Sequence, residues 1–192
     1  MKKYLIILEG IATSGKTTVL KNLEKNLKYS YVVRSFTEQE TLMTILDNHE
    51  FAVASKHLDN LLIEFQKTSA DIIITDRYHF THAFRTDKNL DSISKLEESI
   101  IKDFKAHIFL LTIQEDKISE RVQDARSRRK EWSGKVGTLE EKTKYYIEQQ
   151  QKLRELAKQS KIPVTEINTT SMNWSEIENE IINDMKLKSI EI

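Results

Sequence analysis

The sequence predicts a three-layer α/β fold in which a five-stranded parallel sheet is flanked by helices. Short runs of β-branched and aliphatic residues recur between longer stretches of helical periodicity, and this alternation is typical of parallel βα units. The runs are almost continuously apolar, as are strands that are buried on both faces. We expect the five strands at residues 3–9, 31–36, 72–75, 107–113 and 163–167.

Between the first three predicted strands, apolar side chains recur at helical spacing. Such stripes form the buried faces of amphipathic helices and indicate core packing rather than function. The two stripes are Val19, Leu20, Leu23 and Leu27, then Leu58, Leu61, Leu62 and Phe65. They predict the helices that connect the first strand to the second and the second strand to the third.

The segment at residues 119–146 differs from the rest of the chain. It is polar and rich in Lys, Arg and Glu, and it contains Gly134 and Gly137, two of only four glycines. We expect a mobile, mostly helical lid there. No linker, repeat or low-complexity tract divides the 192 residues, a length that suits one hydrophobic core. We therefore expect a single domain over residues 1–192.

Composition excludes several classes of protein. The 30 basic and 30 acidic residues balance, so the net charge does not favour binding to nucleic acid or to a membrane surface. The absence of cysteine excludes disulfides and thiolate metal sites. The apolar run at residues 4–8 is far shorter than the roughly 20 residues of a membrane span. We expect a cytoplasmic protein that acts on a small molecule, with no nucleic-acid or membrane partner.

Residues 10–17 match the phosphate-binding loop pattern GxxxxGK[ST] completely. The match lies between a predicted strand and a predicted helix, the context that its mechanism requires. Glycines at both ends let successive backbone N–H groups point at phosphate oxygens, and the helix adds its positive N-terminal end. Lys16 is expected to contact the β- and γ-phosphates of ATP, and the Thr17 hydroxyl to ligate Mg²⁺. The predicted nucleotide contacts are Gly10, Thr13, Ser14, Gly15, Lys16, Thr17 and Thr18.

Other classes of P-loop protein fit the chain less well. A GTPase also carries DxxG and NKxD segments, and neither occurs in this sequence. Motors and AAA-type ATPases usually carry more sheet and further domains than 192 residues supply. The length favours a kinase of small molecules.

An acid and a base follow the third predicted strand. Asp76 and Arg77 come directly after this strand, at the carboxyl edge of the sheet where ligands bind in such folds. Asp76 is a candidate ligand of Mg²⁺, directly or through water, and Arg77 is a candidate contact for a phosphate of the acceptor. An ordinary surface ion pair is the alternative.

Four further segments carry a family resemblance. They are Leu8-Glu9-Gly10 before the loop, Asp76-Arg77-Tyr78, Phe109-Leu110-Leu111 leading to Arg121-Val122, and residues 164–170 before the last predicted helix. With these segments, the chain resembles the thymidylate kinase family and its deoxynucleoside kinase relatives over nearly its whole length. The resemblance implies the P-loop kinase fold with an arginine-rich helical lid, a need for ATP and Mg²⁺, and a nucleoside monophosphate as acceptor. It also implies a homodimer.

The predicted lid carries four arginines within nine residues: Arg121, Arg126, Arg128 and Arg129. A closing lid can bring a guanidinium to the transferring phosphoryl group, which is worth about 10³-fold or more in rate. Residues 11–14 of the loop contain no arginine, so the lid is the expected source, with Arg126 and Arg128 as the predicted catalytic residues. The alternative is a solvated basic face paired with Glu120, Asp124 and Glu131.

The acceptor side departs from the thymidylate kinase pattern. Residues 34–40 lack the family's Arg-Glu-Pro-Gly stretch, and Lys56 stands near the place of an expected arginine. Glu38 or Glu40 could instead act as a general base toward a hydroxyl, as a glutamate after strand two does in deoxynucleoside kinases. Ordinary exposed acids are the alternative.

Aromatic and histidine side chains complete the set of candidates. Phe36 and Tyr78 could stack on or wall in a base, or could simply pack in the core. His79 and His82 have the i, i+3 spacing of a metal pair but no neighbouring Cys or carboxylate signature, so we do not predict a metal there.

These residues together favour ATP- and Mg²⁺-dependent phosphoryl transfer to a nucleoside monophosphate. The predicted acceptor contacts are Phe36, Glu38, Lys56, Arg77 and Tyr78. Two alternatives remain open. One is a kinase of a hydroxyl group on a nucleoside or another small metabolite, and the other is an ATP-binding regulatory protein without turnover.

Overall fold

The five predicted strands form one parallel sheet. The computed structural model describes residues 2–42, 51–89, 91, 94–129 and 136–187. Its strands are β1 (Lys3–Gly10), β2 (Val33–Phe36), β3 (Ile72–Asp76), β4 (Phe104–Thr112) and β5 (Val164–Asn168). They pair in the order β2-β3-β1-β4-β5, and every pairing is parallel. The predicted fold class is confirmed, although β2 begins two residues later and β4 three residues earlier than expected.

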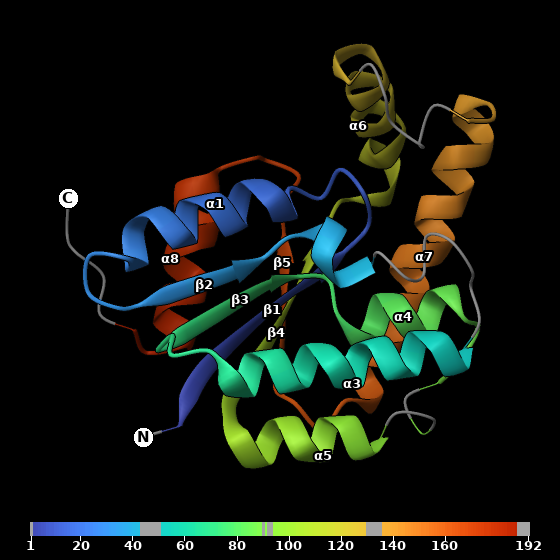
Figure 1. Cartoon of the computed structure of the whole chain (residues 1–192). Coiled ribbons are helices and arrows are strands. Elements are labelled where there is room, and N and C mark those ends of the chain that lie inside the picture. Colours follow the sequence, from blue (N-terminus) through green and yellow to red (C-terminus); the bar gives the residue numbers. More distant parts are fainter. Residues whose placement is uncertain (1, 43–50, 90, 92–93, 130–135, 188–192) are drawn as a thin grey trace.

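Helices cover both faces of this sheet (Figure 1). On one face lie α1 (Lys16–Leu27) and α8 (Trp174–Asp184), and on the other lie α3 (Phe51–Lys67), α4 (His79–Arg85), α5 (Ser94–Asp103) and α7 (Leu139–Gln159). The helix α6 (Glu115–Arg128) follows β4 and, with the first half of α7, extends beyond the sheet. None of the helices in the described ranges has the length and apolar content that crossing a bilayer requires.

The core consists of two apolar layers separated by the sheet. Along β1, Leu5 and Ile7 face the layer under α3 and α5, while Ile6 and Leu8 face the layer under α1 and α8. All four side chains are fully buried, as the continuous apolar run predicts for a central parallel strand. The two predicted helix stripes are buried in these layers as well.

Parallel pairing brings the ends of the central strands to one edge of the sheet. Leu8 is in register with Asp76, and Gly10 is in register with Leu111. The loops that follow β1, β2, β3 and β4 therefore start side by side, which is where open α/β sheets bind ligands. The phosphate-binding loop and the segment of Asp76 and Arg77 both lie at this edge.

The predicted lid, residues 119–146, includes most of α6 and the start of α7. Residues 130–135, which include Gly134, lie outside the described residues. A capping box fixes the start of α7, because Thr138 Oγ1 accepts a hydrogen bond from the Glu141 amide and the Glu141 carboxylate accepts one from the Thr138 amide. The helical character predicted for this segment is confirmed where it is described.

Candidate active site

The phosphate-binding loop connects β1 to α1 in a tight turn that requires its glycines. Gly10 has a φ of 143° and Gly15 a φ of 90°, values that side chains disfavour. A Cβ on Gly10 would lie 2.3 Å from the carbonyl oxygen of Leu111, and one on Gly15 would lie 2.4 Å from the ring of Trp174. Thr13 also has a positive φ, of 79°. The loop is thus held in a shape that leaves its concave side to a ligand.

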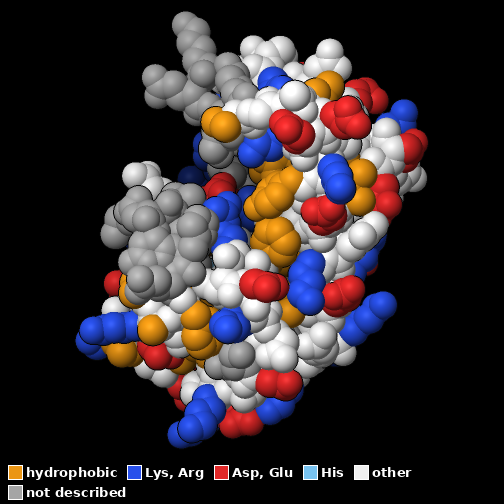
Figure 2. Space-filling view, turned by 90° about the vertical axis from the view of Figure 1, so that its right-hand side faces the viewer, with side chains coloured by type: hydrophobic (Ala, Val, Ile, Leu, Met, Phe, Trp, Pro, Cys, Tyr) orange, Lys and Arg blue, Asp and Glu red, His pale blue; other side chains and the backbone are white. Residues whose placement is uncertain are grey.

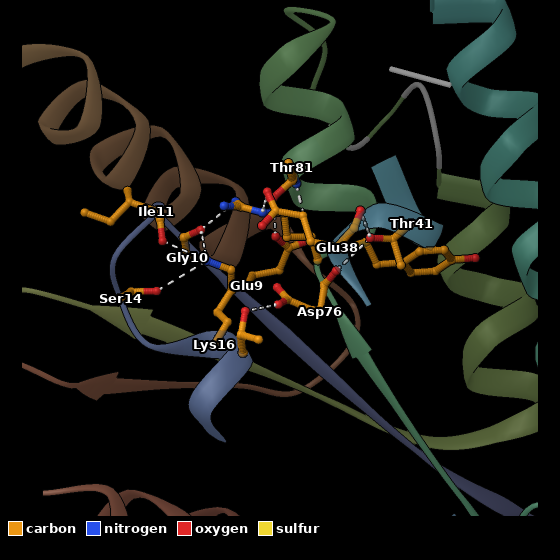
Figure 3. A network of polar contacts seen from close by, with 12 residues as sticks. Glu9, Gly10, Ile11, Ser14, Lys16, Glu38, Thr41, Asp76 and Thr81 are labelled. Carbon is orange, nitrogen blue, oxygen red and sulfur yellow. Dashed lines mark hydrogen bonds and ion pairs between the residues drawn. The ribbon is translucent and has the colours of Figure 1, made fainter. Parts of the chain in front are cut away.

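Lys16 opens α1 and is only 4% exposed. Its Nζ donates hydrogen bonds to the carbonyl oxygens of Gly10 (3.0 Å) and Ile11 (2.7 Å), so the ammonium lies within the curve of the loop (Figure 3). Burial and then the charge of Arg77 lower its pKa to about 8. The lysine remains mainly protonated at neutral pH and is ready to pair with a phosphate.

The side chains of Thr17 and Asp76 are hydrogen-bonded to each other. The Thr17 hydroxyl donates a 2.9 Å hydrogen bond to Asp76 Oδ2. Asp76 Oδ1 is buried and has no hydrogen-bond partner among the described residues. A hydroxyl and a carboxylate with an unsatisfied oxygen are the hard oxygen donors that Mg²⁺ prefers, so this pair fits the metal.

Arg77 and Glu38 form an ion pair beside the loop. Arg77 Nε donates to Glu38 Oε1 at 3.0 Å, and Arg77 Nη1 donates to the carbonyl oxygen of Gly10 at 2.8 Å. Burial alone would raise the pKa of Glu38, but the charges of Arg77 and Lys16 outweigh it and lower that pKa below its ordinary value. The carboxylate is therefore ionised at neutral pH.

Glu9 fixes the segment that carries Asp76 and Arg77. Its fully buried carboxylate accepts hydrogen bonds from the amides of Tyr78 (2.9 Å) and Phe80 (3.1 Å), and from the amide and hydroxyl of Thr81. Three of these donors belong to the start of α4, whose first N–H groups have no partner within the helix. The residue before the loop thus anchors the turn between β3 and α4 (Figure 3).

A cavity of about 580 Å³ lies between the loop and α7. Its size is that of a site for a small ligand. The lining residues are Ala12, Thr13, Gly15, Lys16, Thr17, Thr18, Glu38, Gln39, Arg77, Arg85, Arg129, Lys142, Tyr145, Tyr146 and Gln149. On the face in Figure 2, basic side chains border a hollow beside a row of hydrophobic ones. Residues of the phosphate-binding loop and the Glu38–Arg77 pair thus line the same cavity.

Comparison with known proteins bears on the fold. No protein-family model matches the chain, and no curated protein matches it. The YorR protein of Bacillus subtilis, solved in complex with phosphorylated GDP, is similar with a TM-score of 0.65 and 18% identity, over 95% of each chain. Shikimate kinase from Bacteroides thetaiotaomicron is similar with a TM-score of 0.60 and 14% identity, over 96% of this chain and 99% of its own.

Thymidylate kinase from Candida albicans is a third similar structure, with a TM-score of 0.54 and 17% identity over 96% of this chain and 93% of its own. The chain has the P-loop kinase fold. At such identities the likeness is one of fold and does not extend to the acceptor.

Two aromatic residues predicted at the acceptor lie in the core of this P-loop kinase fold. Phe36 is 3% exposed and packs edge-on against Phe65, with ring centroids 4.7 Å apart. Tyr78 is fully buried, and its hydroxyl donates to the carbonyl oxygen of Leu58 at 2.9 Å. Neither residue lines the cavity, so the packing alternative describes them. Lys56 is exposed on α3 and does not line it either.

The lid arginines Arg126 and Arg128 have partners outside the cavity in this structure, and their catalytic role stays a prediction. Arg126 donates to the carbonyl oxygens of Gly137 and Thr138, and Arg128 pairs with Asp124 on the surface of α6. Neither lines the cavity, because each guanidinium is directed to a partner near its own helix. Arg129 lines the cavity instead.

Arg121 lies on the loop side of α6. Its Nη2 donates to the carbonyl oxygen of Thr13 at 3.1 Å, and its guanidinium lies 6.0 Å from the ring centroid of Trp174. The same Trp174 ring contacts the loop at Gly15. Arg121 therefore braces the phosphate-binding loop from α6.

The two glutamates and the two histidines predicted as candidates differ in their surroundings. Glu38 faces the cavity, whereas Glu40 bonds to Arg34 and to the amide of Thr37, at the start of a helical turn. His79 pairs with the buried Glu97 at 2.9 Å, and His82 Nε2 bonds to the carbonyl oxygen of Thr41. The described ranges contain no cluster of three or more His, Cys, Asp or Glu that could hold a metal.

Sequence reasoning missed the contribution of α7 and of Arg85. Lys142, Tyr145, Tyr146 and Gln149 all line the cavity, and their i, i+3, i+4, i+7 spacing places them on one face of α7. The sequence itself contains this spacing, which places the four residues on one face of a helix. It joined polar and aromatic residues rather than apolar ones, so it did not indicate a buried face.

Proposed function

We propose that this chain is an ATP- and Mg²⁺-dependent kinase whose acceptor is a nucleoside monophosphate. The main support for this proposal is the excess of basic over acidic residues that line the cavity. Among the described lining residues, five are basic and one is acidic: Lys16, Arg77, Arg85, Arg129 and Lys142 against Glu38. A site that brings two phosphate-bearing molecules together needs such an excess of cations, because both reactants are anions.

On the donor side, the loop and Lys16 hold the β- and γ-phosphates of ATP. Thr17 and Asp76 would hold Mg²⁺, which would supply positive charge to neutralise the phosphates. Asp76 Oδ1, buried without a hydrogen-bond partner among the described residues, supports this assignment. The existing contacts of Lys16 with loop carbonyls keep its ammonium near the place that these phosphates take.

On the acceptor side, Arg85 is the candidate contact for the phosphate. It lies at the end of α4, lines the cavity, and its Nε is buried without a hydrogen-bond partner among the described residues. Arg77, by contrast, is held by Glu38 and by the Gly10 carbonyl. We assign Arg77 to positioning Glu38 and the loop, and Arg85 to the acceptor.

The reaction joins an acceptor phosphate oxygen to the γ-phosphorus of ATP and breaks the bond from that phosphorus to the β–γ bridging oxygen. The electron pair of the broken bond remains on ADP. Lys16 and Arg129 stabilise the charge on the transferring group, with Arg129 in the role that the sequence gave to Arg126 and Arg128. We propose that α6 and the start of α7 move as a lid to exclude water.

One observation favours a second candidate, a kinase of a hydroxyl acceptor. The Glu38 carboxylate lines the same cavity as Lys16, and its lowered pKa means that it is ionised at neutral pH. A hydroxyl acceptor benefits from such a base, whereas a phosphate acceptor is already nucleophilic.

ADP release with ATP and Mg²⁺, measured across a panel of nucleoside monophosphates and their parent nucleosides, tests the proposal. Stimulation by a monophosphate supports it, and stimulation by nucleosides alone selects the hydroxyl candidate. Tight ATP binding without transfer to any compound would instead identify a non-catalytic nucleotide sensor. The control is Lys16→Ala, which removes the donor contact and should abolish the signal.

A further inference from the structure

The wall of the cavity opposite the phosphate-binding loop is formed by α7. Lys142, Tyr145, Tyr146 and Gln149 line it from one helical face. None of the four is needed by the donor side, where the loop, Thr17 and Asp76 account for the phosphates and the metal. The composition of this face is that of a recognition surface, with two aromatic rings, an amide and one cation.

Gln149 has unused hydrogen-bonding capacity at this face. The residue is only 2% exposed, yet it lines the cavity, and its amide forms no hydrogen bond with any other described residue. A primary amide offers two donors and an acceptor oxygen. The unused hydrogen-bonding capacity of Gln149 is therefore available to an occupant of the cavity.

In the next residue, Gln150, both ends of the side-chain amide have hydrogen-bond partners. Its Nε2 donates to the carbonyl oxygen of Ile113 at 2.8 Å, and its Oε1 accepts from the amide of Ile113 at 2.8 Å. This pair of bonds fastens α7 to the end of β4 and so sets which face of the helix meets the cavity. Gln150 holds the helix in place, and the neighbouring Gln149 lines the cavity.

The two tyrosines supply flat apolar surface next to this amide. Their ring centroids lie 5.3 Å apart with the planes at 65°, and Tyr146 is 5% exposed whereas Tyr145 is 36% exposed. Tyr145 also lies under the Lys142 ammonium, at 5.6 Å. An aromatic corner beside an amide is suited to a planar ring that carries a hydrogen-bonding edge.

We infer that this face of α7 recognises the heterocyclic base of the acceptor, with Gln149 forming paired hydrogen bonds to the edge of the base and Tyr145 and Tyr146 contacting its plane. The inference rests on the proposed nucleotide acceptor and adds to it the part of the chain that reads the base. The amide of Gln149 can present donor and acceptor in either order, so the neighbouring side chains set which base is preferred.

The test is calorimetric binding of dTMP, dCMP, dAMP and dGMP to the full chain with ADP and Mg²⁺, beside deoxyribose phosphate, which has no base. The wild-type chain should bind its preferred nucleotide about tenfold or more tighter than deoxyribose phosphate, the scale of a bidentate base contact. Gln149→Leu should remove most of that preference and leave the affinity for ADP unchanged. The matched control is Gln151→Leu, because Gln151 is exposed on the same helix and bonds to Glu115.

Loss of preference in Gln149→Leu but not in Gln151→Leu supports the inference. No preference in the wild-type chain, or a preference that survives in Gln149→Leu, overturns it. Gln149→Met serves the same purpose if the leucine variant does not fold. Base-selective binding without phosphoryl transfer would contradict the proposed function but support this inference. Phosphoryl transfer to nucleotides with a selectivity that does not depend on Gln149 would support the proposed function but contradict this inference.

Discussion

The hydroxyl of Thr81 donates a 2.6 Å hydrogen bond to the buried carboxylate of Glu9. These residues are 72 positions apart in the chain, and the bond joins the last part of β1 to the start of α4. Because Glu9 directly precedes the phosphate-binding loop and Thr81 follows Asp76 and Arg77 closely, the contact joins the loop to the segment that carries Asp76 and Arg77. The relative placement of the two halves of the site depends on it.

Removal of this carboxylate should destabilise the fold. Glu9→Ala leaves the amides of Tyr78 and Phe80 and both donors of Thr81 without their acceptor. We expect the free energy of unfolding in urea to fall by about 2–4 kcal/mol, since unsatisfied buried donors are costly. Glu120→Ala, at an exposed position of α6, should change stability by no more than about 0.5 kcal/mol. Equal stability of Glu9→Ala and the wild-type chain would disprove the anchoring role.

Asp76 should control the metal dependence of turnover. Asp76→Asn retains an oxygen for the Thr17 hydroxyl but removes the negative charge that Mg²⁺ requires. We expect kcat to fall by about 100-fold, or about 2.7 kcal/mol of transition-state stabilisation, and the Mg²⁺ concentration for half-maximal rate to rise. Steady-state rates over a Mg²⁺ titration measure both. An unchanged Mg²⁺ requirement would show that Asp76 does not serve the metal.

Arg85 should act on the acceptor alone. Arg85→Ala removes a guanidinium that lines the cavity and whose Nε has no hydrogen-bond partner in the described structure. The acceptor KM should rise roughly tenfold or more, in line with a charge-assisted contact worth about 1.5–3 kcal/mol, with little change in the KM for ATP. Lys102→Ala, at an exposed position near the end of α5, is the control for loss of one positive charge. A rise confined to the KM for ATP would move Arg85 to the donor side.

Stability should depend on pH through Glu97. Burial alone would raise the pKa of Glu97, but hydrogen bonds from His79, Ser160 and the Lys161 amide, with the charge of His79, lower it below 4.5. Since the folded-state pKa is the lower one, this stabilisation is complete above about pH 4.5 and is lost as the pH falls through the folded-state value. Glu97→Gln should cost about 1–2 kcal/mol at pH 7, and the difference should narrow below pH 4.5.

Urea unfolding of the wild-type chain and of Glu97→Gln, at pH 7 and at a series of lower pH values, measures how their difference in stability narrows. A stability difference that stays constant with pH would contradict it. His79→Gln provides a check from the other partner of the pair, because it removes the imidazole that bonds to Glu97.

The position of the phosphate-binding loop could be predicted because its pattern is encoded locally. Eight consecutive residues specify the phosphate-binding loop, and the parallel sheet brings Asp76 beside it in register with Leu8. The sequence also predicted Glu38 or Glu40 as a candidate general base. Choosing Glu38 over Glu40 required the tertiary structure, since only the position of Arg77 directs one of the two carboxylates to the cavity.

The surroundings of the other candidates could not be predicted, because helix orientation and long-range packing decide them. Phe36 and Tyr78 suit a base as well as a core, and only the approach of Phe65 from α3 places them in the core. Arg128 is four residues from Asp124, so their pairing follows once the segment is helical. The face of α7 that meets the site is set by the bonds of Gln150 to Ile113, a contact across 37 residues that sequence periodicity does not reveal.

The most direct measurement is phosphorus NMR of the purified chain incubated with ATP, Mg²⁺ and dTMP, with each of the other nucleoside monophosphates in parallel. Nucleotide kinase activity predicts that one monophosphate resonance is replaced by the two resonances of its diphosphate, at the rate at which ADP forms, and that Lys16→Ala shows neither change. Accumulation of ADP with inorganic phosphate alone, or of a new phosphomonoester when nucleosides are supplied instead, would contradict phosphoryl transfer to a nucleoside monophosphate.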